Sequence, residues 1–352
     1  MKIGIPKEIK TLEGRVGLIP AACSSLVNAG HEVFIENDAG VLSGYDTSEF
    51  MAAGVQILPD ADAVFEKAEM IVKVKEPIGP ELERLQSHHR LFSYLHLAAE
   101  IPLMNKLKEI GLTAVAFETV EENRLLPLLA PMSDIAGRLA SQIGTNLLQR
   151  PNGGKGLLLG GLPGADRGHV VIIGGGVVGS NAAIIAAAMG ARVTVFDTNR
   201  TKQEHLRAIA PNVTALYPFP NLVHEAVADA DLLIGAVLIT GEKAPHIVTR
   251  EMVKSMSAGS VIVDVAVDQG GCIETTKPTT YADPTYVDEE VLHFGVTNMP
   301  GAVPRSASQA LSASLLPYVL KLAQKDWREN DALVKGINVD GGKVVHPALM
   351  EL

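Results

Sequence analysis

Short apolar runs alternate along the chain with segments in which apolar residues recur every three or four positions. The runs are typical of buried strands, and the longer segments are typical of helices that pack on a sheet. In the first part of the chain this pattern predicts strands at residues 2–6, 31–36, 70–74, 91–95 and 113–118, with helices at 20–29, 60–68 and 101–110. Alternation of this kind predicts βαβ units and a mostly parallel sheet.

The same alternation resumes in the second part of the chain. It predicts strands at residues 169–173, 192–196, 213–217, 231–237 and 260–265, with helices at 180–189, 201–209, 222–228 and 249–256. A long helix is expected before them, from Ser133 to about Gln149, with Ser133 as its N-cap. A glycine-rich junction follows at residues 152–164. These elements indicate a second α/β sheet between about residues 169 and 296.

The last helical segment, from about Ser306 to Trp327, carries apolar residues on all sides, so we expect it to be buried against the first sheet. In the tail, two short strands at 337–339 and 343–345 are expected to flank a turn. The predicted fold class is therefore α/β, with two Rossmann-like, doubly wound parallel-sheet domains separated by a cleft. The first domain is discontinuous and comprises residues 1–131 and 305–352, and the second comprises residues 132–304.

Composition and charge narrow the class of protein. A chain of 352 residues is long enough for two domains, and a net charge of −10 argues against nucleic-acid binding. Cys23 and Cys272 are too few for a disulfide scaffold and fit no metal-ligand spacing, so we expect buried thiols, a reducing compartment and no metal. The chain begins with a short strand and not a signal peptide, and its most apolar window, residues 170–191, is interrupted by glycines. We expect a soluble, cytoplasmic protein without a membrane partner.

Candidate chemistry begins where the strand at 169–173 ends. Gly174-x-Gly176-x-x-Gly179 follows that strand, a helix follows the glycines, and the next strand ends at Asp197. This order is the dinucleotide-binding fingerprint, because the glycines let the backbone approach a pyrophosphate at a helix N-terminus and the acid binds a ribose 2′-hydroxyl. A tight turn without a ligand is the alternative, but the complete order of elements favours a nucleotide.

Asp197 also selects between cofactors. A carboxylate at this position hydrogen-bonds a free ribose hydroxyl and repels a 2′-phosphate, which favours NAD. Arg200 and Lys202 follow closely and could meet a phosphate, so NADP stays open. The second domain is therefore predicted to bind NAD, and the first to hold the substrate.

Ionisable groups in the first domain stand just past predicted strands. Arg15 could hold a carboxylate bidentately, although a solvated surface arginine is the simpler interpretation. Lys73 and Lys75, two positions apart, are expected on one face at the end of a strand. There they either bind a ligand or belong to a solvent-exposed edge strand. His96 could move a proton near neutral pH. A lone histidine is more often a core residue, but its placement parallel to Lys75 favours function.

Two acids accompany the strand at 260–265 in the second domain. We interpret Asp264 as a residue that makes hydrogen bonds inside the domain. Asp268, close to two glycines at the strand's end, is interpreted as functional, because it could orient an imidazole or take up a proton.

Taken together, several motifs resemble the alanine dehydrogenase family. They are Gly4–Lys10 with Arg15-Val16, Val72–Pro77, Tyr94–Ala98, Leu128–Ser133, Asp264–Cys272 and Asn298–Pro304. The resemblance runs from the N-terminus to about Trp327, and the motifs are specific jointly, not singly.

The resemblance implies reversible oxidative deamination of L-alanine to pyruvate and ammonia with NAD. It implies that Arg15 and Lys75 hold the substrate, that His96 is the general acid and base, and that Asp268 is a second proton-handling residue. The family is usually hexameric, so a homo-oligomer is expected. The expected cofactor site comprises Ser133, Gly174, Gly176, Val177, Val178, Gly179, Asp197, Lys202, Val237, Leu238, Val265, Ala266, Val267, Asp268, Val296, Thr297, Asn298 and Met299.

The chain departs from the family pattern at two positions. Pro218 stands where a serine or threonine is expected to help hold the adenosine end, and proline cannot donate that bond. Lys277 stands where the family often has arginine.

Three other functions remain open. The NAD-binding component of a transhydrogenase shares the architecture but carries an arginine and a glutamine where this chain has Leu129-Ala130-Pro131. A related NAD-dependent amino-acid or opine-type dehydrogenase differs only in a pocket wall that the sequence does not reveal. The third alternative is a nucleotide-binding regulator or adhesin without catalysis. The ionisable residues at the strand ends argue against it, because such a protein would need none of them.

Overall fold

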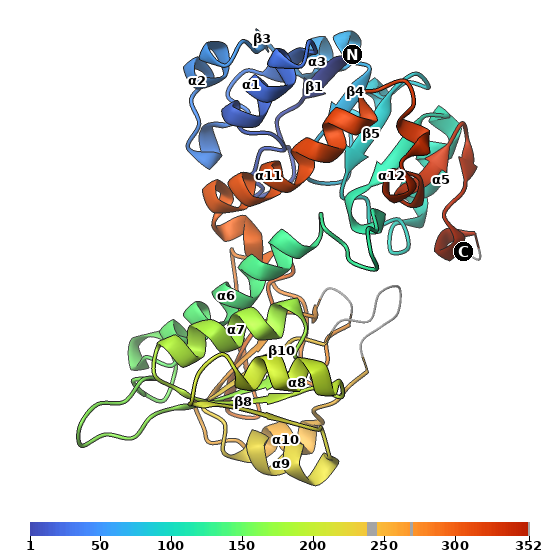
Figure 1. Ribbon diagram of the computed structural model, residues 1–352. Helices are drawn as coiled ribbons and strands as arrows, with labels where there is room; N and C mark the ends of the chain where they lie inside the picture. Colours follow the sequence, from blue (N-terminus) through green and yellow to red (C-terminus); the bar gives the residue numbers. More distant parts are fainter. Residues whose placement is uncertain (238–244, 268–269, 351–352) are drawn as a thin grey trace. The chain divides into compact units, whose positions relative to one another are not determined.

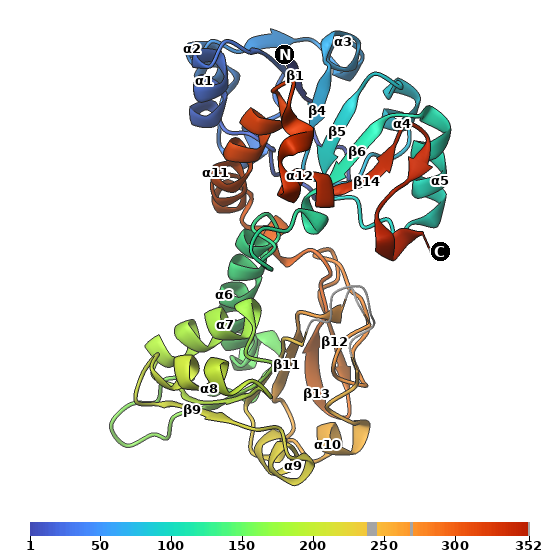
Figure 2. The same cartoon turned by 45° about the vertical axis from the view of Figure 1, so that its right-hand side comes forward.

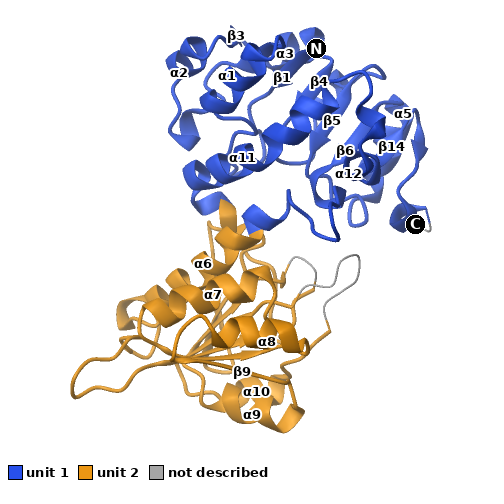
Figure 3. Cartoon of the chain, in the orientation of Figure 1, with its two compact units in different colours: residues 1–132, 301–352 blue, residues 133–300 orange. Residues whose placement is uncertain are grey.

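The computed structural model describes residues 1–237, 245–267 and 270–350 (Figure 1). The chain forms two compact units: unit 1 comprises residues 1–132 and 301–352, and unit 2 comprises residues 133–300 (Figure 3). In the described part of the chain, no helix is both long enough and apolar enough to cross a membrane.

Unit 1 contains a sheet with the strand order β15-β14-β6-β5-β4-β1-β2-β3. Its strands are β1 (Lys2–Ile5), β2 (Glu32–Glu36), β3 (Gln56–Leu58), β4 (Met70–Val72), β5 (Arg90–Ser93), β6 (Thr113–Ala116), β14 (Ile337–Asp340) and β15 (Lys343–Val344). Neighbours from β3 to β6 pair in parallel, whereas β14 pairs antiparallel with both β6 and β15. The carboxyl ends of β1, β4 and β5 therefore meet at one edge of the sheet.

The helices of unit 1 cover this sheet. They are α1 (Pro20–Asn28), α2 (Thr47–Ala52), α3 (Ala61–Lys67), α4 (Glu81–Arg84), α5 (Ile101–Ile110), α11 (Pro304–Leu322) and α12 (Asp331–Lys335), with 3₁₀ turns η1 (Val41–Ser43), η2 (Phe117–Thr119), η6 (Trp327–Glu329) and η7 (Pro347–Leu349). Apolar side chains of β4, β5 and β6 pack against α5, with Ile71, Leu91 and Leu107 fully buried. The short elements β3, α2 and α4 were not predicted.

The expectation that the last long helix is buried on all sides is wrong. Helix α11 is buried along one face only, and small residues such as Ala313 lie in solvent on the other. On the buried face, the hydroxyl oxygens of Ser308 and Ser312 accept the backbone N–H groups of Val16 and Ile19, each at 3.0 Å. The helix therefore packs against the chain that follows β1, which is the segment carrying Arg15.

Unit 2 contains a sheet with the strand order β12-β13-β11-β10-β7-β8-β9. Its strands are β7 (His169–Ile173), β8 (Arg192–Phe196), β9 (Val213–Leu216), β10 (Leu232–Gly235), β11 (Val261–Asp264), β12 (Thr285–Asp288) and β13 (Val291–Phe294). The pairs from β9 to β13 are parallel, and only the pair β12–β13 is antiparallel within the described sheet. Figure 2 shows β11, β12 and β13 on one side of this unit.

Helices flank the second sheet as well. They are α6 (Ala130–Leu147), α7 (Val177–Ala188), α8 (Arg200–Arg207), α9 (Pro220–Ala228) and α10 (Arg250–Lys254), with 3₁₀ turns η3 (Arg150–Asn152) and η5 (Met299–Ala302). Helix α6 begins at Ala130, so the prediction that Ser133 is its N-cap is wrong. Two mostly parallel sheets with flanking helices confirm the predicted α/β fold class with two Rossmann-like domains.

Candidate active site

The carboxyl edge of the unit 1 sheet carries three of the predicted groups. Arg15 lies in the loop after β1, Lys75 lies in the segment after β4, and His96 lies in the segment after β5. Because β4 pairs in parallel with both β1 and β5, these segments leave the sheet as neighbours. Ligands of α/β sheets bind at this edge.

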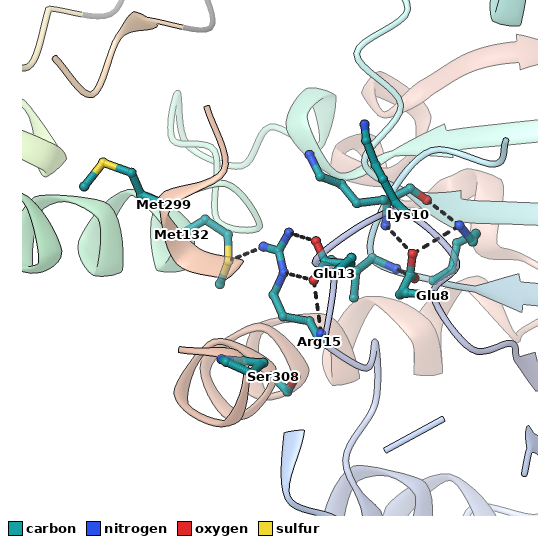
Figure 4. Close-up of polar contacts among 12 residues, drawn as sticks. Glu8, Lys10, Glu13, Arg15, Met132, Met299 and Ser308 are labelled. Atoms are coloured by element: carbon teal, nitrogen blue, oxygen red, sulfur yellow. Dashed lines mark hydrogen bonds and ion pairs between the residues drawn. The ribbon is translucent and has the colours of Figure 1, made fainter. Parts of the chain in front are cut away.

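Arg15 is buried and held by an acid two residues before it. Its side chain donates from Nε to Glu13 Oε1 at 2.7 Å and from Nη2 to Glu13 Oε2 at 2.6 Å, while Nη1 lies 3.1 Å from Met132 Sδ (Figure 4). Burial opposes the charge, but the carboxylate of Glu13 leaves the pKa of Arg15 raised. The simpler interpretation of a solvated surface arginine is therefore wrong, since Arg15 is 3% exposed.

Lys73 and Lys75 have different environments, which the sequence did not predict. The strand ends at Val72, and the chain bends at the two residues before Glu76. Lys73 is 1% exposed and ion-paired to acids inside the unit, whereas Lys75 is half-buried. The alternative of a solvent-exposed edge strand is wrong as well, because β4 lies between β5 and β1.

The pKa of Lys75 depends on its burial and on the charged groups around it. Burial lowers the pKa of Lys75, and the positive charges of Arg15 and Lys10 lower it further, against the effect of Glu76. Lys10 forms an ion pair with Glu76, and Figure 4 places Lys10 in the same cluster as Glu13 and Arg15. Lys75 thus lies close enough to Arg15 for the charge of Arg15 to lower its pKa, and two cations at the same sheet edge suit a carboxylate.

His96 lies in a strained turn that an acid from η2, the 3₁₀ turn after β6, holds. Its φ is +49°, which is uncommon for a residue other than glycine. Glu118 Oε1 accepts the backbone N–H of His96 at 2.6 Å and lies 4.0 Å from His96 Nδ1. The side chain of His96 is 43% exposed, so its imidazole is accessible rather than a core residue.

Tyr94 packs against His96 and lies within electrostatic range of Arg15. Its ring stacks on the imidazole of His96 with centroids 5.9 Å apart, and its hydroxyl donates to the carbonyl oxygen of Leu128 at 2.6 Å. Burial raises the pKa of Tyr94, and the positive charge of Arg15 opposes that rise. No role was predicted from the sequence for Glu13, Tyr94 or Glu118. One signal in the sequence could have identified Glu118, because it is an acid at the end of the strand predicted at residues 113–118.

In unit 2, the glycines of the segment from β7 into α7 differ in how much room surrounds them. Gly174 has a φ of +99°, which favours glycine. A Cβ at Gly179 would collide with the carbonyl oxygen of Gly174, whereas a Cβ at Gly176 would have no neighbour within 4 Å. The first turn of α7 is therefore packed closely against the loop at Gly179, while the loop is open at Gly176, as approach of a pyrophosphate requires.

Asp197 follows β8 and points back to this loop. Its Oδ2 accepts the N–H of Gly175 at 2.8 Å, its Oδ1 accepts the N–H of Asn199 at 2.7 Å, and Lys202 Nζ lies 3.7 Å from Oδ2. The carboxylate therefore stands beside the glycine loop, with one cation next to it.

Most of the other predicted cofactor residues lie in the segments that follow the strands of unit 2. Val177 and Val178 open α7, Val237 follows β10, residues 265–267 follow β11, and residues 296–299 follow β13. Because β10, β11 and β13 extend the sheet from β7, these positions share its carboxyl edge. Ser133 lies in the first turn of α6. Leu238 and Asp268 lie outside the described residues.

Two further predictions concern buried groups of unit 2. Asp264 is fully buried and accepts the N–H groups of Ala266 and Cys272, at 3.0 and 2.9 Å, so its interpretation as an internal hydrogen-bonding residue is confirmed. Cys272, like Cys23 in unit 1, is a buried free thiol. Across the described ranges, no three His, Cys, Asp or Glu side chains gather in a way that could hold a metal ion.

Comparison with known proteins gives two matching family models. The model for the N-terminal domain of alanine dehydrogenase/PNT matches residues 4–136, and the model for its C-terminal domain matches residues 140–347. The chain belongs to the alanine dehydrogenase/PNT family. A nucleotide cofactor follows from this membership and from the Rossmann-like units.

Relatives in the alanine dehydrogenase/PNT family cover almost the whole chain. The alanine dehydrogenase of Methanococcus maripaludis is 50% identical over 99% of this chain and 95% of its own length. A solved L-alanine dehydrogenase is 51% identical with a TM-score of 0.97, covering 100% of this chain and 98% of that one. A transhydrogenase from Sinorhizobium meliloti is 26% identical with a TM-score of 0.86, covering 99% of this chain and 100% of its own.

Proposed function

We propose that this chain is an NAD-dependent alanine dehydrogenase, which converts L-alanine to pyruvate and ammonia and also catalyses the reverse reaction. The observation that carries the proposal is the cationic pair Arg15 and Lys75, at the same sheet edge as the accessible imidazole of His96. The names and full-length coverage of the relatives support the same activity.

In the proposed complex, unit 1 binds the substrate. Arg15 binds the carboxylate, and Lys75 binds the carboxylate and polarises the carbonyl oxygen of pyruvate. Two cations in a partly buried site stabilise the negative charge that develops on that oxygen. Glu13 fixes the guanidinium of Arg15 through two parallel hydrogen bonds, so that less rotamer freedom is lost when substrate binds.

His96 is the proposed general acid and base. It takes a proton from the water that attacks the imine of alanine, and it returns a proton to the departing ammonia. Its exposed imidazole allows this exchange, and Glu118 fixes its backbone. Asp268 is proposed as a second proton-handling residue.

NAD fits the glycine loop of unit 2. The backbone at Gly176 has no neighbour that would block a pyrophosphate, and the N-terminus of α7 favours its negative charge. Asp197 suits the ribose hydroxyls of NAD. When bound, the cofactor accepts the hydride from the α-carbon of the substrate. The remaining proposed contacts are those of the predicted cofactor set.

The experiment that tests this function is a panel of small amino acids with NAD and with NADP, followed by NADH absorbance. We expect the highest kcat/KM with L-alanine and NAD. Preference for another amino acid would instead indicate a related amino-acid or opine-type dehydrogenase. The absence of any amino-acid oxidation, with NAD still bound, would favour the NAD-binding component of a transhydrogenase.

We further infer a cytoplasmic homo-oligomer, a hexamer by family resemblance. This inference rests on the chain's membership of the alanine dehydrogenase/PNT family. Light scattering of the purified protein would measure the subunit number, and a monomer would contradict it.

A further inference from the structure

Lys73 has no place in the proposed chemistry, yet it is among the most buried cations of the described chain. Its side chain is 1% exposed, and its Nζ lies 3.2 Å from Glu8 Oε2 and 3.1 Å from Glu81 Oε1. Burial alone would lower the pKa of Lys73, but the two carboxylates leave it raised. The ammonium is therefore charged and enclosed.

The chain after β4 turns around this ammonium. Lys73 Nζ donates to the carbonyl oxygens of Lys75 at 3.0 Å and Glu76 at 3.4 Å. Glu8 accepts the N–H groups of Val74 at 2.6 Å and Lys75 at 3.3 Å. These bonds fix the peptide groups on both sides of the Lys75 Cα.

Glu81 fixes the far end of the same turn. Its Oε2 lies 3.2 Å from Lys73 Nζ and accepts the N–H of Ile78 at 2.9 Å. The loop between β4 and α4 thus takes its shape from three buried charged side chains rather than from a regular ladder.

Buried ion pairs contribute little net stability compared with well-packed apolar side chains, because desolvation offsets the attraction. A network of this kind does fix geometry, since each buried charge requires its partners in place. Here the geometry fixed is that of the backbone from which the Lys75 side chain extends.

We propose that Lys73 is a positioning residue for Lys75: its buried ammonium, clamped by Glu8 and Glu81, holds the loop that aims the Lys75 side chain at the substrate. This inference rests on the proposed function, in which Lys75 binds the substrate. The two lysines of the Lys-Val-Lys motif then have separate tasks, one inside the unit and one at its edge.

A double-mutant cycle on the full-length protein tests the proposal. We expect Lys73→Met to lower kcat/KM for L-alanine by about 10- to 100-fold while the NADH dissociation constant changes by less than about twofold. In a Lys75→Ala background, the same Lys73→Met change should cost less than about threefold, because there is no longer a lysine to aim. An equal loss in both backgrounds, or no loss in folded protein, would overturn the proposal.

Matched controls separate this effect from general loss of structure. Lys106→Met removes an exposed lysine of unit 1 and should leave both constants unchanged. All activities are compared per folded molecule, with the folded fraction taken from circular dichroism.

A milder variant keeps the test decisive if Lys73→Met does not fold. Glu81→Gln retains an oxygen that can accept from Ile78 N–H but loses the charge that clamps Lys73. It should lower kcat/KM about three- to tenfold in the wild-type background and not in Lys75→Ala, whereas the exposed Glu83→Gln on the same helix should have no effect. A wild-type rate for folded Glu81→Gln would contradict the proposal.

Failure of the proposed function would give a different result. If the wild-type protein does not oxidise alanine, or if Lys75→Ala leaves kcat/KM unchanged, the substrate assignment is wrong. If Lys75→Ala is impaired but Lys73→Met is not, only the positioning role is wrong.

Discussion

The buried carboxylate of Glu13 is the counter-ion that keeps Arg15 charged inside unit 1. A buried guanidinium without a partner would carry a large desolvation cost, and the two parallel bonds to Glu13 offset it. Glu118 has the comparable task at His96, where it binds the backbone of a left-handed residue. Two groups of the proposed site are therefore each held by an acid: Glu13 binds the guanidinium of Arg15, and Glu118 binds the backbone of His96.

Replacement of His96 tests its role in proton transfer. His96→Ala should lower kcat by about 100-fold or more, because proton transfer to and from the substrate is lost. NADH affinity should stay nearly unchanged, since His96 belongs to unit 1. Stopped-flow rates and NADH fluorescence measure the two quantities, with the exposed His224→Ala as the control. A fall in NADH affinity as large as the fall in kcat would mean that the residue is misplaced.

The lowered pKa of Lys75 predicts a pH dependence. Lys75 attracts pyruvate only in its ammonium form, whereas Arg15 stays charged, so affinity should be constant below the pKa of Lys75 and fall above it, by up to tenfold per pH unit, towards the binding that Arg15 alone supports. Because burial and neighbouring cations lower that pKa, the fall should begin below the ordinary lysine value of 10.5. In Lys75→Arg, whose guanidinium stays charged, the fall should move to higher pH. Inhibition by pyruvate, measured against alanine as a function of pH, gives the curves of the wild type and of Lys75→Arg. Identical curves would mean that Lys75 does not bind the substrate.

Asp197 should set the preference between cofactors. Asp197→Ala should reduce the kcat/KM ratio of NAD to NADP by about tenfold or more, through loss of a charged hydrogen bond and of repulsion toward a 2′-phosphate. Asp197→Asn serves as the comparison, since it keeps an oxygen that can accept from Gly175 N–H. A ratio that does not change in either variant would count against this assignment.

At single positions, the sequence indicated candidate residues but did not predict their surroundings. It identified Arg15, Lys75 and His96 as candidates, because charged groups stood out after apolar strands. It did not predict Glu13 or Glu118 as partners, because that requires knowing which strand ends are neighbours and how each loop bends. The different environments of Lys73 and Lys75 were missed for the same reason, since a period of two holds only while the strand continues.

Among the elements, the connection from β7 into α7 contains glycines that are required for two different reasons. Gly179 must be glycine for the helix to pack on the loop, whereas Gly176 has room for a side chain in the protein itself.

This difference predicts two distinct variants. Gly176→Ala should leave the unfolding temperature unchanged and weaken NADH binding by about tenfold or more, because the methyl group takes the place of the pyrophosphate. Gly179→Ala should weaken binding and also destabilise the fold by about 2 kcal/mol, because the loop must move. Thermal unfolding and NADH titration measure both; equal destabilisation by the two changes would contradict the distinction.

Long elements with strong periodicity were predicted well, and short or polar ones were not. Helix α5 was predicted with its observed bounds, Ile101–Ile110. The hairpin of β12 and β13 was missed because its turn uses Glu289 and Glu290, both with positive φ, where glycine or asparagine is the usual signal. The burial of α11 was overestimated because its solvent face carries polar residues such as Gln309 and Lys321 beside Ala313, and the sequence pattern did not separate this face from the buried one.

At the scale of the whole molecule, unit 2 is one continuous segment with its own sheet and core. A fragment of residues 130–300, which keeps all of α6, should therefore fold cooperatively and bind NADH, but should not oxidise alanine. Thermal circular dichroism and NADH fluorescence would measure folding and binding. A fragment without a cooperative transition would mean that unit 2 requires unit 1.

Unit 1, in contrast, contains both ends of the chain. The backbone at Val16 and Ile19 binds hydroxyls of α11, and β6 receives β14 as its neighbour, yet both partners come after unit 2 in the sequence. A ribosome adds roughly 5–20 residues per second, so the segment that carries Val16 leaves it roughly 15 to 60 seconds before the α11 segment does. The loop that carries Arg15 therefore reaches its final packing only after all of unit 2 and the α11 segment have been synthesised.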